Sequence, residues 1–179
     1  MKTTQILIAG FGGQGILFAG KFLAYKGLME DLQVSWLPSY GPEMRGGTAN
    51  CNVILSETPV GSPIVTQPDV LIAMNLPSLQ KYVNSVAPGG QIYVDSSLIE
   101  EKVTRTDVEV FYIPATQMAK AEGIASLANM IIIGSLLENN SELSFEGTEA
   151  VVTKLVPPKK AALVELNMKA LTLGKEYGA

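Results

Sequence analysis

The sequence predicts an α/β fold: a three-layer, Rossmann-like domain with a mostly parallel sheet covered by helices on both faces. Two observations predict it. Short apolar segments alternate with segments of helical spacing along most of the chain. The first apolar segment also runs into a glycine turn, and a helix follows directly. The 179 residues suit one domain, 1–179, with a C-terminal helical segment at about 144–175.

The N-terminal elements follow from apolar runs and their breakers. Residues 5–9 form a short, mostly apolar run that ends at glycine, which indicates a buried strand. The helix after the turn, 16–26, carries the small residues Ala19 and Gly20, which would let it lie close to a sheet, and Gly27 is its expected C-cap. Strand 32–37 is expected to end at Pro38, and a further strand at 49–55.

The middle of the chain continues the alternation. Residues 70–74 and 91–94 are buried strands, and the helix between them, to about residue 86, begins with Pro77 near its first position. Pro88 and two glycines end that helix. A strand at 108–113 leads through Pro114 into a short helix at 115–121.

Three helices complete the prediction. Residues 126–139 form an apolar, central helix, and Ser144 caps a helix at 145–155. Pro157 and Pro158 open the last helix, to about residue 174, which is apolar on two faces. A helix of this kind is usually core, and the alternative is that one stripe docks on a partner chain. One stripe is Leu163, Leu166, Ala170 and Leu173, and the other is Val164, Met168 and Leu171.

Composition excludes several classes of chemistry. The sequence has no histidine and one cysteine, Cys51, so it offers no histidine base, no structural zinc site, no iron–sulfur cluster and no internal disulfide. We expect Cys51 to be buried and no metal to be bound. Net charge is −4 with scattered basic residues, which argues against nucleic-acid binding. No run is long enough to span a membrane and residues 1–4 do not resemble a signal peptide, so we expect a soluble, cytoplasmic protein.

The glycine turn is GFGGQG at 10–15, which fits the spacing G-x-G-x-x-G. Glycines permit sharp turns and close approach of a ligand, and a helix N-terminus favours anions. A dinucleotide fingerprint also needs an acidic residue at the end of the second strand. Here Glu30 and Asp31 precede that strand, and its end at 37–39 holds no carboxylate. Dinucleotide binding is therefore only weakly indicated.

A second glycine-rich stretch occupies 38–47, PSYGPEMRGG. Arg45 beside Gly46 and Gly47 could bind an anion through its guanidinium and nearby backbone N–H groups, and Tyr40 offers a flat apolar face with a polar tip. A structural loop with a Glu43–Arg45 ion pair is the simpler interpretation. Because both glycine-rich stretches follow strands of a parallel sheet, we expect them at the same sheet edge, as a surface for a phosphate-bearing ligand or another subunit.

These two stretches, GFGGQG at 10–15 and WLPSYGPEMRGGTANC at 36–51, resemble the gamma subunit of 2-oxoacid:ferredoxin oxidoreductases. The likeness is closest to the 2-oxoglutarate and 2-oxoisovalerate branch, and the same domain occurs in pyruvate:ferredoxin oxidoreductase and indolepyruvate oxidoreductase. Shorter likenesses lie at 61–63, 68–69, 88–90 and 128–130, and the resemblance weakens after about residue 140.

The resemblance implies a subunit of an enzyme that oxidatively decarboxylates a 2-oxoacid, here 2-oxoglutarate by preference, to an acyl-CoA. Thiamine diphosphate, magnesium and iron–sulfur clusters would sit on partner alpha, beta and ferredoxin-like delta subunits, with ferredoxin as electron acceptor and coenzyme A as co-substrate. This chain would be non-redox, inactive alone, bind none of these cofactors by itself, and be able to self-associate when isolated.

The family's gamma domain is associated with the coenzyme A side of the reaction. Gly12, Gly13, Gln14 and Gly15, with Tyr40, Arg45 and Gly46, are therefore expected to form a surface near the CoA phosphates or at a subunit interface. No catalytic residue is assigned to this chain. The alternatives are a stand-alone NAD(P)-binding oxidoreductase, or a regulatory or scaffold domain without a ligand.

Overall fold

The structure is a computed structural model that describes residues 2–39 and 48–178. Its centre is a six-stranded sheet in the order β2-β3-β1-β4-β5-β6. β1, β4, β5 and β6 run parallel, whereas β3 is antiparallel to both of its neighbours, β1 and β2. The strands are β1 (Thr3–Phe11), β2 (Gln33–Ser39), β3 (Thr48–Ser56), β4 (Val70–Ala73), β5 (Gln91–Asp95) and β6 (Glu109–Ile113).

The antiparallel β3 was not foreseen in a sheet expected to be mostly parallel. The connection from β2 to β3 spans only 40–47. A parallel crossover needs about a dozen residues or more, so a connection this short returns the chain in the opposite direction. β2 and β1 therefore point the same way, on either side of β3.

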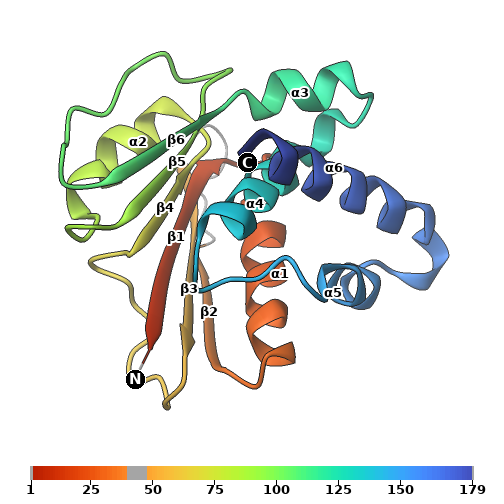
Figure 1. Cartoon of the computed structure of the whole chain (residues 1–179), viewed down its shortest axis with the longest axis horizontal. Coiled ribbons are helices and arrows are strands. Elements are labelled where there is room, and N and C mark those ends of the chain that lie inside the picture. Colours follow the sequence, from red (N-terminus) through yellow and green to blue (C-terminus); the bar gives the residue numbers. More distant parts are fainter. Residues whose placement is uncertain (1, 40–47, 179) are drawn as a thin grey trace.

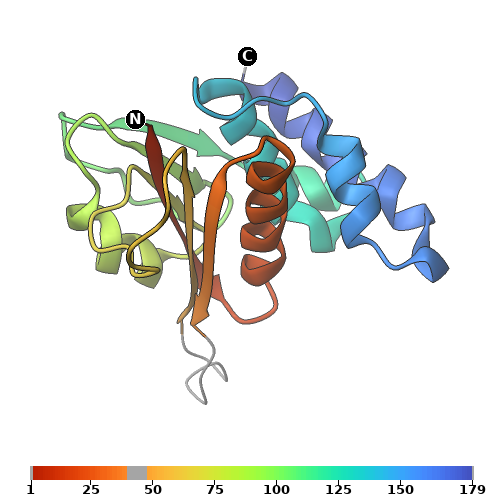
Figure 2. The same cartoon turned by 90° about the horizontal axis from the view of Figure 1, so that it is seen from below.

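Helices cover both faces of the sheet, as predicted, but unequally (Figure 1). Viewed from below, α2 lies on one side of the sheet and α1 with the C-terminal helices on the other (Figure 2). This confirms the three-layer α/β class. The helices are α1 (Ile16–Met29), α2 (Leu76–Tyr82), α3 (Ala115–Ala121), α4 (Ala128–Asn139), α5 (Thr148–Leu155) and α6 (Ala162–Gly178), with 3-10 turns η2 (Val83–Ser85), η3 (Ala125–Leu127) and η4 (Pro158–Lys160).

Two apolar clusters, one on each face of the sheet, make the core. Ile6 and Ile8 of β1 point into the larger cluster, with α1, α3, α4, α5 and α6. Leu7, between them, points into the smaller cluster beneath α2. This alternation is the period-2 pattern of a strand buried on both faces. The larger cluster includes Cys51, which is buried as expected.

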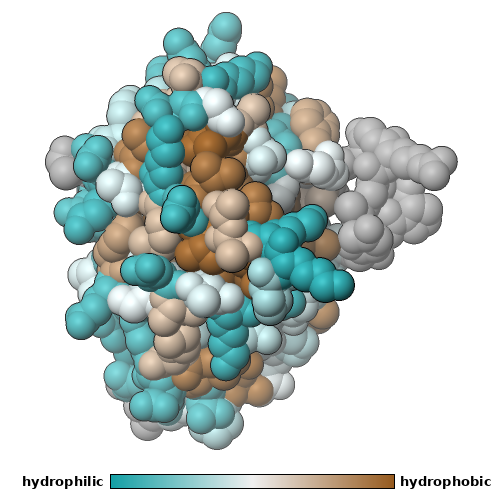
Figure 3. Space-filling model, turned by 90° about the vertical axis from the view of Figure 1, so that its right-hand side faces the viewer, coloured by the Kyte–Doolittle hydropathy of each residue, from teal (hydrophilic) through white to brown (hydrophobic). Residues whose placement is uncertain are grey.

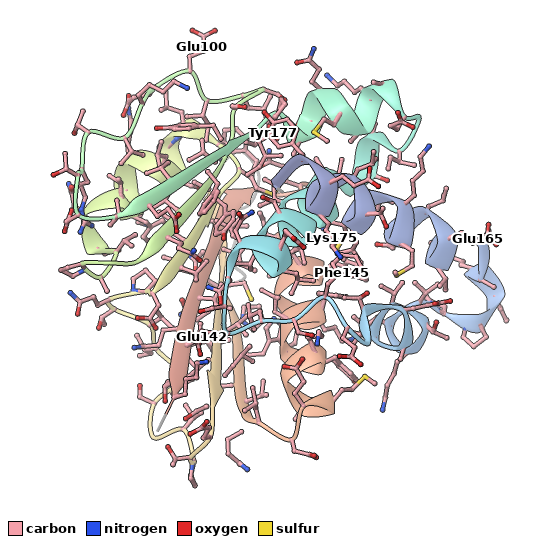
Figure 4. The ribbon with its side chains drawn as sticks, viewed as in Figure 1. Glu100, Glu142, Phe145, Glu165, Lys175 and Tyr177 are labelled. Atoms are coloured by element: carbon pink, nitrogen blue, oxygen red, sulfur yellow. The ribbon has the colours of Figure 1, made fainter. Side chains whose placement is uncertain are left out.

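The central helix α4 is crossed closely by α6, and glycines make the contact. A Cβ atom on Gly134 would lie 2.0 Å from the carbonyl oxygen of Leu171, and one on Gly174 would lie 1.7 Å from that of Ile131. Each glycine thus admits the backbone of the other helix. Lys175 of α6 also lies over the Phe145 ring, 4.8 Å from its centroid, as the labelled side chains show (Figure 4).

The structure also shows which apolar residues of the two predicted stripes on α6 are buried and which are exposed. Ala170 and Leu171 are buried, while Leu163 and Leu166 are 36% and 39% exposed. The N-terminal half of the helix thus leaves apolar side chains on the surface. Figure 3 shows apolar side chains gathered on the face where α5 and α6 lie.

Several predicted boundaries are wrong. The last helix begins at Ala162, after a 3-10 turn at Pro158–Lys160, and ends at Gly178 rather than near residue 174. Gly27 lies inside α1, which ends at Met29, because its missing Cβ makes room for Leu55 of β3, whose Cδ2 would lie only 2.6 Å away. Pro38 lies inside β2, which is an edge strand and so tolerates a residue without an N–H donor. Ser144 does not cap α5. Its hydroxyl accepts from the Glu146 N–H, and α5 begins after Gly147, at φ 74°.

Candidate functional site at the carboxyl edge of the sheet

The two glycine-rich stretches start from the same edge of the sheet. β1 ends at Phe11, and the Cα atom of Phe11 pairs with that of Thr48, the first residue of β3. Ser39, the last residue of β2, pairs with Asn50, which in turn pairs with Ala9. Tyr40, Arg45 and Gly46 lie outside the described residues, but the residues on either side of 40–47 lie level with the glycine loop.

This edge contains a topological switch point. β1 and β4 are adjacent and parallel. The chain leaves β1 for α1 on one face, and leaves β4 for α2 on the other. Open α/β sheets bind ligands in the crevice that forms where successive connections diverge in this way. The ends of β1 and β4 are therefore the first place to look for a site.

The glycine loop between β1 and α1 is a tight turn. The Gln14 N–H donates to the Phe11 carbonyl oxygen at 3.2 Å. Gly13 and Gly15 have φ values of 95° and 75°, which favour glycine. Gly12 and Gly13 are exposed at the surface. The Ala19 N–H then donates to the Gly15 carbonyl oxygen as the first bond of α1, which receives no side-chain cap at Gly15.

Gln14 bridges the two strands at the switch point. Its Oε1 accepts from the Phe11 N–H at 2.6 Å, and its Nε2 donates to the Met74 carbonyl oxygen at 2.8 Å. Gly10 makes this possible, because a Cβ atom there would lie 2.5 Å from Gln14 Oε1. Gly10, the first glycine of the motif, thus makes room for the Gln14 side chain. A dinucleotide fingerprint does not require a glutamine at that position.

Asn129, in the first turn of α4, holds the other end of the loop. Its Nδ2 donates to the Gly15 carbonyl oxygen at 3.0 Å, and a Cβ atom on Gly15 would lie 2.4 Å from this Nδ2. The sequence marked Asn129 only through the resemblance at 128–130 and gave it no role. A buried asparagine in a helix otherwise filled by apolar residues is the signal that could have found it.

Asn75 and Ser78 complete the edge on the α2 side. Asn75 lies two residues after the end of β4, and its Oδ1 accepts from the Ser78 N–H at 2.9 Å, capping α2. Both residues are buried. The sequence predicted a helix start here without a site role. A polar residue just after a buried parallel strand is the signal that points to the ligand-binding edge.

Asp95, at the end of β5 on the same edge, is fully buried, and both of its carboxylate oxygens accept hydrogen bonds. Its Oδ1 accepts from the backbone N–H groups of Ser97 and Thr116, at 3.1 and 3.3 Å, and its Oδ2 accepts from the Thr116 hydroxyl at 2.5 Å. Asp95 therefore fastens the β5 connection to α3, and three of the about four acceptor positions of its carboxylate are used within the chain.

Two other groups add nothing to a ligand site at this edge: the Cys51 thiol, and the acidic residue that a dinucleotide fingerprint would require at the end of β2. Burial raises the pKa of the Cys51 thiol to about 12, against a smaller lowering by its hydrogen bond with Trp36, so the thiol stays protonated at neutral pH. Glu30 lies after α1, before the start of β2, and pairs with Lys26. Within residues 2–39 and 48–178, β2 ends without a carboxylate that could bind a ribose.

A polar hollow of about 660 Å³ lies at the opposite, amino edge of the sheet. The side chain of Gln91 is fully engaged there: its Oε1 accepts from Tyr93 and Asn140, and its Nε2 donates to Glu109. Glu142, which also lines the hollow, forms an ion pair with Lys2. At the carboxyl edge, by contrast, Asn75 and Asn129 each keep a buried polar atom that no described residue pairs. Among the described residues, no helix is long and apolar enough to cross a membrane.

The fold and the edge together define an α/β domain that presents a glycine loop at the switch point of its sheet. The chain belongs to the pyruvate ferredoxin/flavodoxin oxidoreductase family, whose sequence model matches residues 5–177. Solved structures agree. The gamma subunit of a keto/oxoacid ferredoxin oxidoreductase from Geobacter sulfurreducens has a TM-score of 0.83 at 31% identity, covering 98% of each chain.

Relatives differ in how much of their length this chain covers. It is 39% identical to the ketoisovalerate oxidoreductase subunit VorA of Methanothermobacter thermautotrophicus over 97% of this chain but 36% of VorA. It is 35% identical to the 2-oxoglutarate synthase subunit KorC of Methanothermobacter marburgensis over 96% of this chain and 95% of KorC.

A 2-oxoglutarate:ferredoxin oxidoreductase from Magnetococcus marinus, solved with 2-oxoglutarate, coenzyme A and succinyl-CoA bound, has a TM-score of 0.87 at 27% identity. That comparison covers 99% of this chain and 31% of the other. The domain described here thus occurs both as a whole subunit and as about a third of a longer chain.

Proposed function

We propose that this chain is the gamma subunit of a 2-oxoacid:ferredoxin oxidoreductase, with 2-oxoglutarate as the favoured substrate. The observation that carries the proposal is the relationship to KorC, 35% identical over nearly the full length of both chains. The assembled enzyme oxidises the 2-oxoacid, releases carbon dioxide, transfers the acyl group to coenzyme A and passes the electrons to ferredoxin.

Partner subunits supply the redox chemistry in this proposal. Thiamine diphosphate with magnesium, and the iron–sulfur clusters, belong to alpha, beta and ferredoxin-like delta subunits. This chain supplies structure and the coenzyme A side, without a general acid or base of its own. Its one thiol is buried with a raised pKa, which agrees with a non-redox, non-nucleophilic role.

The carboxyl edge is the part that meets coenzyme A. The glycine loop leaves Gly12 and Gly13 exposed at the N-terminus of α1, where backbone N–H groups and the helix dipole favour a phosphate. Arg45 and Gly46, which belong to the segment that begins and ends at this edge, add a guanidinium and a glycine. A stand-alone NAD(P)-dependent enzyme gains no support, because the described end of β2 carries no ribose-binding carboxylate.

Purification of the chain from its own cells without oxygen tests the subunit assignment. We expect larger partners in fixed stoichiometry, identified by mass, and the brown absorbance of iron–sulfur clusters. A colourless chain recovered alone under these conditions would contradict the assignment.

Arg45→Ala in the assembled complex tests the coenzyme A role. We expect the Michaelis constant for CoA to rise about 10- to 100-fold, since a charge-assisted contact to phosphate is lost. The Michaelis constant for the 2-oxoacid should stay unchanged. Arg45→Lys, which keeps the charge and loses the bidentate geometry, should give an intermediate value. Unchanged CoA kinetics with intact assembly would assign this surface to a subunit interface instead.

A further inference from the structure

The polar hollow at the amino edge of the sheet, opposite the glycine loop, has an excess of negative charge. Its lining includes three carboxylates, Asp69, Glu109 and Glu142, but one cationic side chain, Lys2. Lys2 pairs with Glu142. Within residues 2–39 and 48–178, neither Asp69 nor Glu109 forms an ion pair. A hollow of about 660 Å³ with this charge is complementary to a cationic group from outside the domain.

The side-chain amides of the hollow use their donors within the chain. Gln91 Nε2 donates to Glu109 Oε2 at 2.9 Å and to the Asn139 carbonyl oxygen at 3.2 Å. Asn139 Nδ2 donates to the Ser135 carbonyl oxygen at 2.9 Å, and Asn140 Nδ2 donates to Gln91 Oε1 at 2.8 Å. A carboxylate has about four acceptor positions, so Glu109 keeps several of its own. The hollow therefore lacks acceptors' partners, and an ammonium or guanidinium group would supply them.

Both ends of the described chain lie beside this hollow. Lys2 lines it directly. Gly178, the last residue of α6, packs on Asn139, which also lines the hollow, because a Cβ atom on Gly178 would lie 2.5 Å from Asn139 Nδ2. Figure 2 shows the labels N and C on the same side of the molecule. A segment joined to either end of this domain therefore starts beside the hollow.

Longer relatives carry such a segment. Nearly all of this chain is matched, yet it covers 36% of VorA and 31% of the oxidoreductase chain from Magnetococcus marinus. The remainder of those chains leaves the domain from one of its ends. Consecutive Cα atoms lie about 3.8 Å apart, so its first residues stand at the amino edge. KorC, of which this chain covers 95%, has no such remainder.

We propose that the hollow is the docking surface for the larger subunit of the complex, which places lysine or arginine side chains against Asp69 and Glu109. This assignment rests on the proposed function, in which this chain is one subunit of a 2-oxoacid:ferredoxin oxidoreductase. The larger subunit takes the place of the remainder that VorA carries in one chain, so it meets the domain at the same edge. Docking here leaves the glycine loop, at the opposite edge, open to coenzyme A.

Carboxylate labelling of the complex, purified from its own cells without oxygen, is the first test. A carbodiimide with glycinamide converts accessible carboxylates to amides, which mass spectrometry of peptides locates. Glu109 is exposed in this chain. We expect it to be protected in the complex and labelled once high salt has released the chain. Glu100, exposed on the loop between β5 and β6, is the labelled reference in the released chain (Figure 4). Equal labelling of Glu109 before and after release would overturn the inference.

Charge reversal identifies the occupant. We expect Glu109→Lys to raise the dissociation constant between this chain and the larger subunit about 100-fold. Glu109→Gln keeps an oxygen that accepts from Gln91 and should raise it about tenfold. Glu100→Lys adds the same charge outside the hollow and should leave the constant at the wild-type value.

Two results of these variants would contradict the proposal. A wild-type dissociation constant for Glu109→Lys, with an unchanged melting temperature, would overturn it. Separation of two copies of this chain, with the larger subunit still bound, would assign the hollow to a second copy and overturn it as well.

The outcomes separate this inference from the proposed function. If the chain copurifies with larger partners that hold iron–sulfur clusters, but Glu109 is labelled as readily before release as after it, the inference is overturned and the proposed function stands. A colourless chain recovered alone would contradict the proposed function, and the docking surface would fail with it.

Discussion

The ends of β4 and β5 lie side by side on one edge of the sheet, yet their polar side chains differ in how many hydrogen bonds they make. At the end of β5, the Asp95 carboxylate accepts three hydrogen bonds from its own chain. At the end of β4, the amide of Asn75 makes one bond and leaves its nitrogen unpaired among the described residues. The β5 end is thus tied down by hydrogen bonds within the chain, whereas the β4 end keeps a buried donor that no described residue pairs.

The comparison predicts its largest effect at Asp95. Asp95→Asn places an amide nitrogen or a weaker acceptor opposite three donors, and we expect the free energy of unfolding to fall by about 3 kcal/mol. Urea denaturation of the purified protein measures this. Thr116→Val, which removes only the hydroxyl donor, should cost less. A change below 1 kcal/mol for Asp95→Asn would show that the β5 end is not closed by this network.

Gly15→Ala tests the support that Asn129 gives to the loop. Its φ of 75° strains an L-residue, and the new Cβ would lie 2.4 Å from Asn129 Nδ2, so we expect a loss of about 2 kcal/mol. Gly13→Ala is the matched control, because Gly13 has a φ of 95° and no heavy atom within 4 Å of a Cβ. Equal melting temperatures for the two variants would mean that the Asn129 contact adds nothing.

Asn75→Ala should have the smallest effect on stability. It removes the side-chain cap on α2, and we expect the free energy of unfolding, measured by urea denaturation, to fall by about 1 kcal/mol. Asn75→Asp keeps the cap but buries a carboxylate that has one hydrogen-bond donor, so we expect a larger loss. Equal losses for Asn75→Ala and Asp95→Asn would erase the distinction between the two strand ends.

The sequence predicted the layers of this fold better than the details of its edges. Short apolar runs bounded by turn residues, such as 70–73, are typical of buried strands, and their alternation with helices then indicates the class. Gly27 and Pro38 were misjudged because local rules treat glycine and proline as terminators. Here the glycine admits Leu55, and the proline sits on an edge strand. Those reasons depend on neighbours distant in sequence.

The same limit applies to the site. The glycine loop was found from its spacing, since the motif is local. Asn75 and Asn129 were given no role from the sequence. Each has a side-chain atom that is seen to be unpaired only once the chain has folded. Asn129, for example, meets its partner Gly15 across 114 positions of the sequence. No spacing rule reports an unpaired atom. Arg45, Tyr40 and Gly46 stay predictions, because they lie outside the described residues.

The Gln14 bridge also turns one backbone hydrogen into an indicator of occupancy. The Phe11 N–H is held by a side chain from its own loop. A ligand or subunit that displaces Gln14 would free this hydrogen to exchange with solvent, while the interior of β1 stays protected. The exchange rate of a single amide, followed as coenzyme A or a partner subunit is added, would therefore report which of the two moves the loop.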